Sequence, residues 1–220
     1  MCILFDLDGT LVDTAPDFLH ALNHIRVTEG LDPLPLEMIR ATVSHGMQNI
    51  ITLAFGTTKA HPNNHNLYDR VLKTYRDCSG LYATTFPGIL PLLNYLDEHQ
   101  IPWGVVTNKQ AALAEALLER LQLKSRVASI VGGDTTLHAK PHPEPLFHAC
   151  REIGISPEEC VYVGDAERDI QAGKSAGMAT LAALYGYIED ENEVKTWGAS
   201  HIIHHADEIK PWYTAWKKRI

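Results

Sequence analysis

The sequence predicts an α/β fold in which a parallel β-sheet core is interrupted by an inserted all-helical unit. From residue 86 onward, short apolar stretches alternate with helical patterns. Repeated β–α units of this kind build a parallel sheet with helices on both faces. Residues 35–78 instead show helical patterns and no convincing strand. An apolar stretch at residues 2–5, too short for a helix, adds a strand before this helical part.

The helical insertion follows the first strand. Thr14 is a candidate N-cap and Gly30 a stop signal, so "TAPDFLHALNHIRVTEG" is expected to be helical. Further helices are expected over "LEMIRATV", "MQNIITLAFG" and "NLYDRVLKTYRDC", with breaks at "SHG" and at the polar run "TTKAHPNNHN". These patterns divide the chain into a core of residues 1–14 and 81–220 and a helical insertion of residues 15–80.

The remaining core strands are expected over "IPWGVVT", "VASIVGG", "CVYVGD", "ATLAALYG" and "SHIIHHA". The first four follow the helical stretches "GILPLLNYLDEHQ", "KQAALAEALLERLQL", "EPLFHACREIG" and "ERDIQAGKSAG", and a last helix ends the chain. The result is a Rossmann-like parallel sheet. Ligands of such sheets bind beyond the carboxyl ends of the strands, so a helical unit inserted at that end is expected to act as a cap over the site.

Charge and hydropathy exclude several classes of protein. With 19 basic and 27 acidic residues, the net charge of −8 argues against a nucleic-acid groove and against binding to an anionic membrane. No apolar stretch approaches the ~20 residues that cross a bilayer, and the N-terminus lacks the pattern of a secretory signal. The expected location is the cytoplasm. The four cysteines contain no C-x-x-C pair, so no zinc or redox motif is expected and all four are expected to be reduced.

Two acids stand at the end of the first strand, in "FDLDGT". Asp6 and Asp8 are two residues apart, so on an extended strand their side chains point the same way. Gly9 lets the backbone turn close to a ligand. Two carboxylates this close repel each other, and Mg²⁺, which prefers oxygen ligands, relieves that repulsion. A metal site is therefore expected here.

Other strand ends also carry polar residues. Thr107 and Asn108 end one strand, Lys140 follows another, and Asp165 and Asp169 follow a third. In a parallel sheet these ends converge on one crevice. The combined set of carboxylates, a hydroxyl, an amide and a lysine can bind a metal ion and a phosphate together.

These residues resemble the motifs of the haloacid dehalogenase superfamily of phosphotransferases. The matching elements, in chain order, are D-x-D-G-T from Asp6, a threonine after an apolar strand at Thr107, a lysine before proline at Lys140, and G-D-x-x-x-D with Asp165 and Asp169. The resemblance spans nearly the whole chain. It implies an enzyme that forms an aspartyl-phosphate and releases phosphate from a small metabolite.

The resemblance also implies residue roles. Asp6 would be the nucleophile, and Asp8 the acid that protonates the leaving oxygen and then the base that activates water. Mg²⁺ would be held by the Asp6 carboxylate, the Asp8 carbonyl and Asp165, with Asp169 acting through water or from further out. The phosphoryl oxygens would be held by Lys140, by Thr107 and by amides near Asn108.

The organic part of the substrate is expected to meet the cap. In "RATVSHGMQN", His45 and Gly46 are candidate contacts, together with Arg40, Ser44 and Gln48, although a plain helix-capping loop explains the stretch nearly as well. The stretches "WGVVTNK", "KPHPEPL" and "WGASHIIHHADEI" are similar to the branch of phosphoglycolate phosphatases that includes the N-acetylmuramic acid 6-phosphate phosphatases. The implied substrate is 2-phosphoglycolate or a related sugar phosphate.

Several alternatives remain open. N-acetylmuramic acid 6-phosphate is an alternative substrate. A phosphomutase shares every core motif, and a non-catalytic signalling domain also holds an aspartyl-phosphate, although it stores it. The partner is expected to be a small phosphorylated molecule, without nucleic acid or membrane, and the protein to be a monomer or homodimer. The histidines of "HPNNH" (His61, His65) and "HIIHH" (His201, His204, His205) are given no function.

Overall fold

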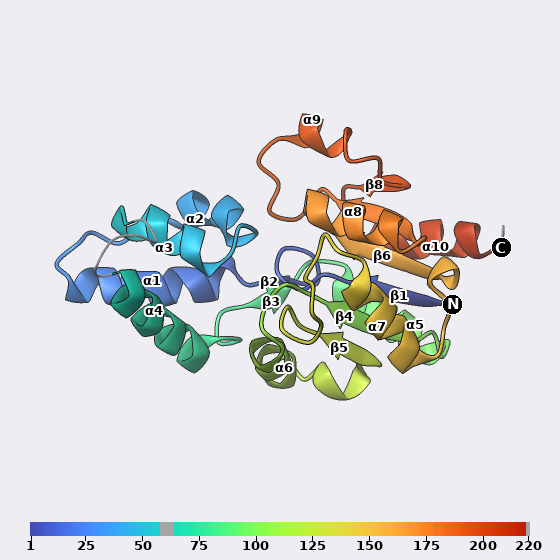
Figure 1. The fold of residues 1–220 in the computed structure, drawn as a ribbon, viewed down its shortest axis with the longest axis horizontal. Helices are drawn as coiled ribbons and strands as arrows, with labels where there is room; N and C mark the ends of the chain where they lie inside the picture. Colours follow the sequence, from blue (N-terminus) through green and yellow to red (C-terminus); the bar gives the residue numbers. More distant parts are fainter. Residues whose placement is uncertain (58–63, 219–220) are drawn as a thin grey trace. The chain divides into compact units, whose positions relative to one another are not determined.

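Figure 1 shows the computed structural model of the protein, which describes residues 1–57 and 64–218. The chain forms two compact units, one of residues Met1–Val12 and Thr85–Ile220 and the other of residues Asp13–Thr84. The first holds the main sheet. The second is helical. Two short strands, β2 (Val12–Asp13) and β3 (Thr84–Thr85), pair with each other, and the division between the units passes through both.

The main sheet has six strands in the order β5–β4–β1–β6–β7–β8, and every neighbouring pair is parallel. The strands are β1 (Cys2–Phe5), β4 (Trp103–Val106), β5 (Ser129–Val131), β6 (Cys160–Gly164), β7 (Ala179–Ala183) and β8 (His201–Ile203). This confirms the α/β class and the parallel core expected from the alternating pattern.

Strand β1 lies in the middle of the sheet, between β4 and β6. Its last residue, Phe5, pairs with Val105 on one side and Val163 on the other. The chain that follows each of these strands therefore emerges at the same edge of the sheet. This is the point where the strand order changes direction, and ligands bind at such points in open α/β sheets.

The helices of the sheet unit alternate with its strands in sequence, and the last of them follows β8. They are α5 (Ile89–Glu98), α6 (Ala111–Arg120), α7 (Glu144–Ile153), α8 (Glu167–Ser175), α9 (Glu191–Val194) and α10 (Ile209–Lys217). Helices α7 and α8 pack on one face, where Leu146 and Ala172 join Leu4 and Val106 in a buried cluster. On the other face Trp103 donates a hydrogen bond to Asp97 of α5.

The helical unit contains α1 (Ala15–Thr28), α2 (Leu36–Val43), α3 (Met47–Phe55) and α4 (Asn64–Cys78). Helices α1 and α4 pack through the stacked rings of Phe18 and Tyr75, whose centroids are 4.1 Å apart. The buried Asp17 carboxylate accepts hydrogen bonds from the backbone N–H groups of Gly80, Tyr82 and Ala83. These bonds tie the start of α1 to the segment that follows α4.

The expectation that all four cysteines are reduced is wrong for two of them. Cys2 and Cys160 form a disulfide, while Cys78 and Cys150 are free and buried. Cys2 and Cys160 are direct partners in the β1–β6 ladder, which explains the pairing across 158 residues of sequence. Spacing along the chain gave no sign of it, because the pairing depends on which strands become neighbours.

Among residues 1–57 and 64–218, no helix combines the length and the apolar character that crossing a bilayer requires.

Candidate active site

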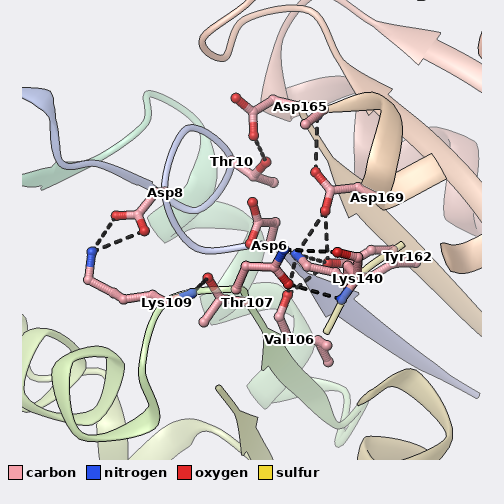
Figure 2. Close-up of polar contacts among 12 residues, drawn as sticks. Asp6, Asp8, Thr10, Val106, Thr107, Lys109, Lys140, Tyr162, Asp165 and Asp169 are labelled. Carbon is pink, nitrogen blue, oxygen red and sulfur yellow. Dashed lines mark hydrogen bonds and ion pairs between the residues drawn. The ribbon is translucent and has the colours of Figure 1, made fainter. Parts of the chain in front are cut away.

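Asp6 is the first residue after β1, and its place is fixed by the sheet. Its backbone N–H donates to the carbonyl of Val163, 2.8 Å away, which continues the bonding between β1 and β6. The Asp6 residue is only 3% exposed. Its Oδ1 accepts a 2.8 Å hydrogen bond from Lys140 Nζ (Figure 2). A carboxylate is thus held, buried and charged, at the centre of the carboxyl edge.

Lys140 reaches the same place from the segment between β5 and α7. Its fully buried ammonium contacts Asp6 Oδ1, the Val106 carbonyl and the Tyr162 hydroxyl at 2.7–2.8 Å, and lies 2.7 Å from Asp169 Oδ1. An ammonium has three N–H donors, so these four acceptors exceed its capacity. The charge of one lysine is shared by two buried carboxylates.

Asn108 holds the backbone of Lys140 in place. Its side-chain Nδ2 donates to the Lys140 carbonyl and its Oδ1 accepts from the Lys140 N–H, both at 3.0 Å. The Asn108 side chain was expected near the phosphate, but in the structure it bonds to the lysine main chain. Its position orients Lys140. The backbone amides near Asn108 remain candidates for the phosphoryl oxygens.

Tyr162 is a neighbour of Lys140 that the sequence analysis missed. It lies in β6 with no exposed surface, and its hydroxyl donates to the Val106 carbonyl at 2.7 Å. A tyrosine inside an apolar strand needs a partner for its hydroxyl, and that requirement was a usable signal. The side chain of Asp169, on α8, lies against the same hydroxyl and also accepts the Ala166 N–H at 3.0 Å.

Asp165 follows β6 and is held by two donors. Thr10 Oγ1 donates to its Oδ1 and the Tyr187 N–H donates to its Oδ2, both at 2.9 Å. Gly9 adopts a φ of +86°, and a Cβ there would collide with the Asp165 carboxylate. The glycine expected to allow close approach to a ligand therefore also makes room for Asp165.

The three carboxylates of Asp6, Asp165 and Asp169 form one cluster. An oxygen from each lies within 4.8 Å of the others, and all three residues are buried. Oxygen donors alone, with excess negative charge, are the set that a hard divalent cation such as Mg²⁺ prefers. The donor set fits the expected metal, and Asp165 and Asp169 join Asp6 as the sequence analysis expected.

The pKa values record the same excess of negative charge. Burial, with the charges of Asp6 and Asp169, raises the pKa of Asp165 to about 7. Burial also raises the pKa of Asp169, although Lys140 opposes it. Burial acts on Asp6 in the same direction, but the charges of Lys140 and Arg168 outweigh it and leave the pKa of Asp6 below its ordinary value. Asp6 is thus kept ionised, which its expected role as nucleophile requires.

Asp8 does not join the carboxylate cluster. Both of its oxygens accept hydrogen bonds from Lys109 Nζ, at 2.7 and 3.0 Å, and Figure 2 shows this pair set apart from the Asp6 carboxylate. Lys109 is nearly buried, with 5% of its side chain exposed. Its contact with Asp8, 101 positions away in sequence, was not anticipated, because it depends on the direction of two side chains beyond the ends of their strands.

Thr107 lies at the end of β4, next to these groups. It is 3% exposed, and its Oγ1 accepts the Lys109 N–H at 3.2 Å. The other two expected binding residues, His45 and Gly46, belong to the helical unit, where they connect α2 to α3. His45 is exposed, and Gly46 has a φ of +88°. Their proposed contact with substrate stays a prediction.

The histidines given no function fall into two groups. His61 lies outside the described residues, while His65 is exposed and lies 3.5 Å from Asp69. His201 is in β8, with its ring 6.4 Å from that of Trp212.

Comparison with known proteins agrees with this geometry. Residues 3–183 match the family described as haloacid dehalogenase-like hydrolase. The chain is 38% identical over 207 residues to an N-acetylmuramic acid 6-phosphate phosphatase from Pseudomonas aeruginosa, covering 94% of this chain and 92% of the relative. It is 41% identical over 201 residues to a phosphoglycolate phosphatase from Xylella fastidiosa, covering 91% and 87%.

Among solved structures, a predicted phosphoglycolate phosphatase from Haemophilus somnus shares the fold, with a TM-score of 0.82, 23% identity and 96% coverage of both chains. The chain belongs to the haloacid dehalogenase-like hydrolases. Within that family it is a phosphoric monoester hydrolase, as the resemblance of its strand-end motifs implied.

Proposed function

We propose that the protein is a Mg²⁺-dependent phosphatase that acts through an aspartyl-phosphate on Asp6, with a small phosphorylated carboxylic acid as substrate. One observation carries the proposal. Asp6 is buried, held ionised by Lys140, and accompanied by two further carboxylates that leave the cluster short of positive charge. A divalent cation would supply the missing positive charge and would allow the negatively charged phosphate ester to bind beside these carboxylates.

Asp6 attacks phosphorus and the ester oxygen leaves. Asp8 donates a proton to that oxygen and later accepts a proton from the water that hydrolyses the aspartyl-phosphate. To act as an acid, Asp8 must first release Lys109 and take up a proton from solvent, since both of its oxygens accept hydrogen bonds from that lysine. We assign Lys109 the role of holding Asp8 until substrate arrives.

Lys140 and Thr107 bind the phosphoryl oxygens. Phosphoryl transfer depends mainly on in-line positioning and on positive charge near the equatorial oxygens. Lys140 supplies such a charge from a rigid position, because its backbone is tied to Asn108 and its ammonium to Asp6 and Tyr162. Asp6, Asp165 and the Asp8 carbonyl would hold Mg²⁺, with Asp169 supporting from further out. The ion would add charge stabilisation on the transferring group.

The named relatives support this substrate class. 2-Phosphoglycolate and N-acetylmuramic acid 6-phosphate differ greatly in size, yet each joins a phosphate ester to a carboxylate. We propose that this carboxylate is recognised from the helical unit, at the segment that carries Arg40, His45 and Gly46. Within that unit Arg40 forms an ion pair with Asp13 at 2.8 Å, so its guanidinium is oriented by one carboxylate. Guanidinium groups bind carboxylates through paired hydrogen bonds, which makes Arg40 a candidate for the carboxylate of the substrate.

The test is phosphate release with Mg²⁺ from matched substrate pairs. N-acetylmuramic acid 6-phosphate is compared with N-acetylglucosamine 6-phosphate, which lacks the carboxylate, and 2-phosphoglycolate with glycerol phosphate. We expect one acid to be hydrolysed far faster than its match, and no turnover by Asp6→Asn. Equal rates within each pair would contradict the substrate class. Negligible release from all four would contradict the phosphatase assignment, and an assay for isomerised sugar phosphate would then test a mutase.

A further inference from the structure

Three side chains of the types that bind metal ions gather beside Lys140 but outside the carboxylate cluster. His138 and His142 lie on either side of Lys140 in the segment before α7, and Glu144 is the first residue of that helix. One nitrogen of each histidine and a carboxylate oxygen of Glu144 lie within 4.8 Å of one another. Neither histidine was singled out by the sequence analysis, because they lie in a segment with two prolines, where their four-residue spacing does not place them on one face of a predicted helix.

The contacts within this group converge on one oxygen. Glu144 Oε2 lies 2.9 Å from His138 Nδ1 and 4.0 Å from His142 Nδ1. The same oxygen accepts the His138 backbone N–H at 3.1 Å. Donor atoms around a tetrahedral zinc ion, with bonds of about 2.0–2.1 Å, are roughly 3.4 Å apart. The two observed separations bracket that value, so small movements would make three ligands equidistant from one ion.

The side chains have the freedom for such movements. The imidazole rings are stacked with centroids 4.4 Å apart, and about half of each histidine side chain is exposed. Rotation of the rings out of their stack would direct both Nδ1 atoms at a shared ion. His142 would exchange the 3.2 Å hydrogen bond that its Nδ1 accepts from the Glu144 N–H for the metal bond. The exposed side would leave a coordination position for water.

The chemistry of this group differs from that of the carboxylate cluster. Two imidazoles and one carboxylate suit a borderline transition-metal ion, whereas carboxylates alone suit Mg²⁺. We propose that His138, His142 and Glu144 form a second metal site, specific for a transition-metal dication of the zinc class. This site goes beyond the proposed phosphatase function and does not depend on it.

An ion at this site would join the residues on both sides of Lys140. His138 precedes the lysine by two positions and His142 follows it by two, while Asn108 holds the lysine backbone between them. The ion would therefore hold the segment that presents Lys140 to Asp6. Occupancy would show in the stability of this segment as well as in metal binding.

The experiment is a competition between the protein and a chromogenic zinc chelator. The full chain is used without an affinity tag, and excess Mg²⁺ is present so that the carboxylate cluster does not take up zinc. His138→Ala/His142→Ala is the test variant and Glu144→Gln removes the third ligand. His148→Ala is the matched control. His148 also lies near a glutamate, 3.2 Å from Glu152, but among the described residues this pair is not part of a group of three possible metal ligands.

We expect the wild-type protein and His148→Ala to bind one zinc ion with the same affinity. The double variant and Glu144→Gln should each bind at least tenfold more weakly, since loss of even an outer partner of a metal ligand costs about 10–100-fold in affinity. Circular dichroism checks that the variants are folded. We expect them to fold, because the two histidine side chains are about half exposed. Unchanged affinity in the double variant, or no zinc uptake by the wild type, would overturn the proposal.

Discussion

Lys140 Nζ lies 2.8 Å from Oδ1 of Asp6, with neither side chain open to solvent by more than 4%. Removing one partner of a buried ion pair costs far more than an exposed pair is worth, because the remaining charge is left without compensation. The lysine thus has a structural role in addition to the phosphate contact proposed for it. The two roles can be separated, since stability is measurable without substrate.

Lys140→Met is expected to lower the free energy of unfolding of the metal-free protein by about 3 kcal/mol, because Asp6 and Asp169 both lose the ammonium that they contact. Urea unfolding in the presence of a chelator measures this. Lys124→Met, at an exposed surface pair, should leave the unfolding midpoint unchanged. An equal midpoint for wild type and Lys140→Met would show that the buried pair contributes little.

The carboxylate cluster predicts that stability depends on pH and Mg²⁺ together. The folded pKa of Asp165, about 7, exceeds its ordinary value of 3.8. The stabilisation from proton binding is therefore complete below about pH 4 and is lost as the pH rises through 7, on the order of 2–4 kcal/mol. Metal-free protein should melt at lower temperature at pH 8 than at pH 5.

Mg²⁺ should reverse this trend, since it binds the ionised carboxylates. We expect the rise in melting temperature on adding Mg²⁺ to be larger at pH 8 than at pH 5. Asp165→Asn, which cannot ionise, should lose most of the pH slope and most of the response to Mg²⁺. A wild-type response to Mg²⁺ that is the same at both pH values would contradict the assignment of the cluster.

Asp17 is expected to be important for the stability of the helical unit. Its carboxylate accepts three backbone N–H groups at 2.5–3.1 Å, and asparagine has only one oxygen to offer. Asp17→Asn should lower the free energy of unfolding by about 2 kcal/mol, as hydrogen bonds to a charged group are lost. Asp69→Asn, at a side chain that is 61% exposed, is the control and should change the unfolding curve little.

The cysteine pairing predicts a thiol count. In denaturant without reductant, Ellman's reagent should detect two thiols, from Cys78 and Cys150, and after reduction it should detect four. In the folded protein Cys150 should react slowly at pH 8, because burial raises the pKa of its thiol to about 11. Four thiols in the unreduced, denatured protein would contradict the disulfide.

The strand-end residues of the core could be predicted because their placement follows from one rule. Asp6, Asp165 and Asp169 each follow a recognisable apolar strand, and parallel strands bring their carboxyl ends to one edge. The contact between Asp8 and Lys109 could not be predicted, because it depends on side-chain direction beyond the strand.

Strand order was the other missing information. Alternation shows that strands exist, but it does not show that β1 lies between β4 and β6. The Cys2–Cys160 disulfide depends on that order, and so does the contact between Tyr162 and the Val106 carbonyl. The cluster of His138, His142 and Glu144 depends on the backbone path of the irregular segment before α7. Hydrophobic periodicity predicts helices and strands, but it does not predict the path of such a segment.

The central place of β1 in the sheet has a consequence for synthesis on the ribosome. Asp6 and β1 leave the exit tunnel well before the strands that flank β1, because β4 starts at Trp103 and β6 at Cys160. The helical unit, in contrast, is one consecutive stretch, Asp13–Thr84, and can fold once it has emerged. The apolar strand β1 therefore has neither of its sheet neighbours until β4 is synthesised, and it lacks β6 until Cys160–Gly164 are added. Pairing between distant segments is slow, so the catalytic edge is assembled among the last events of folding.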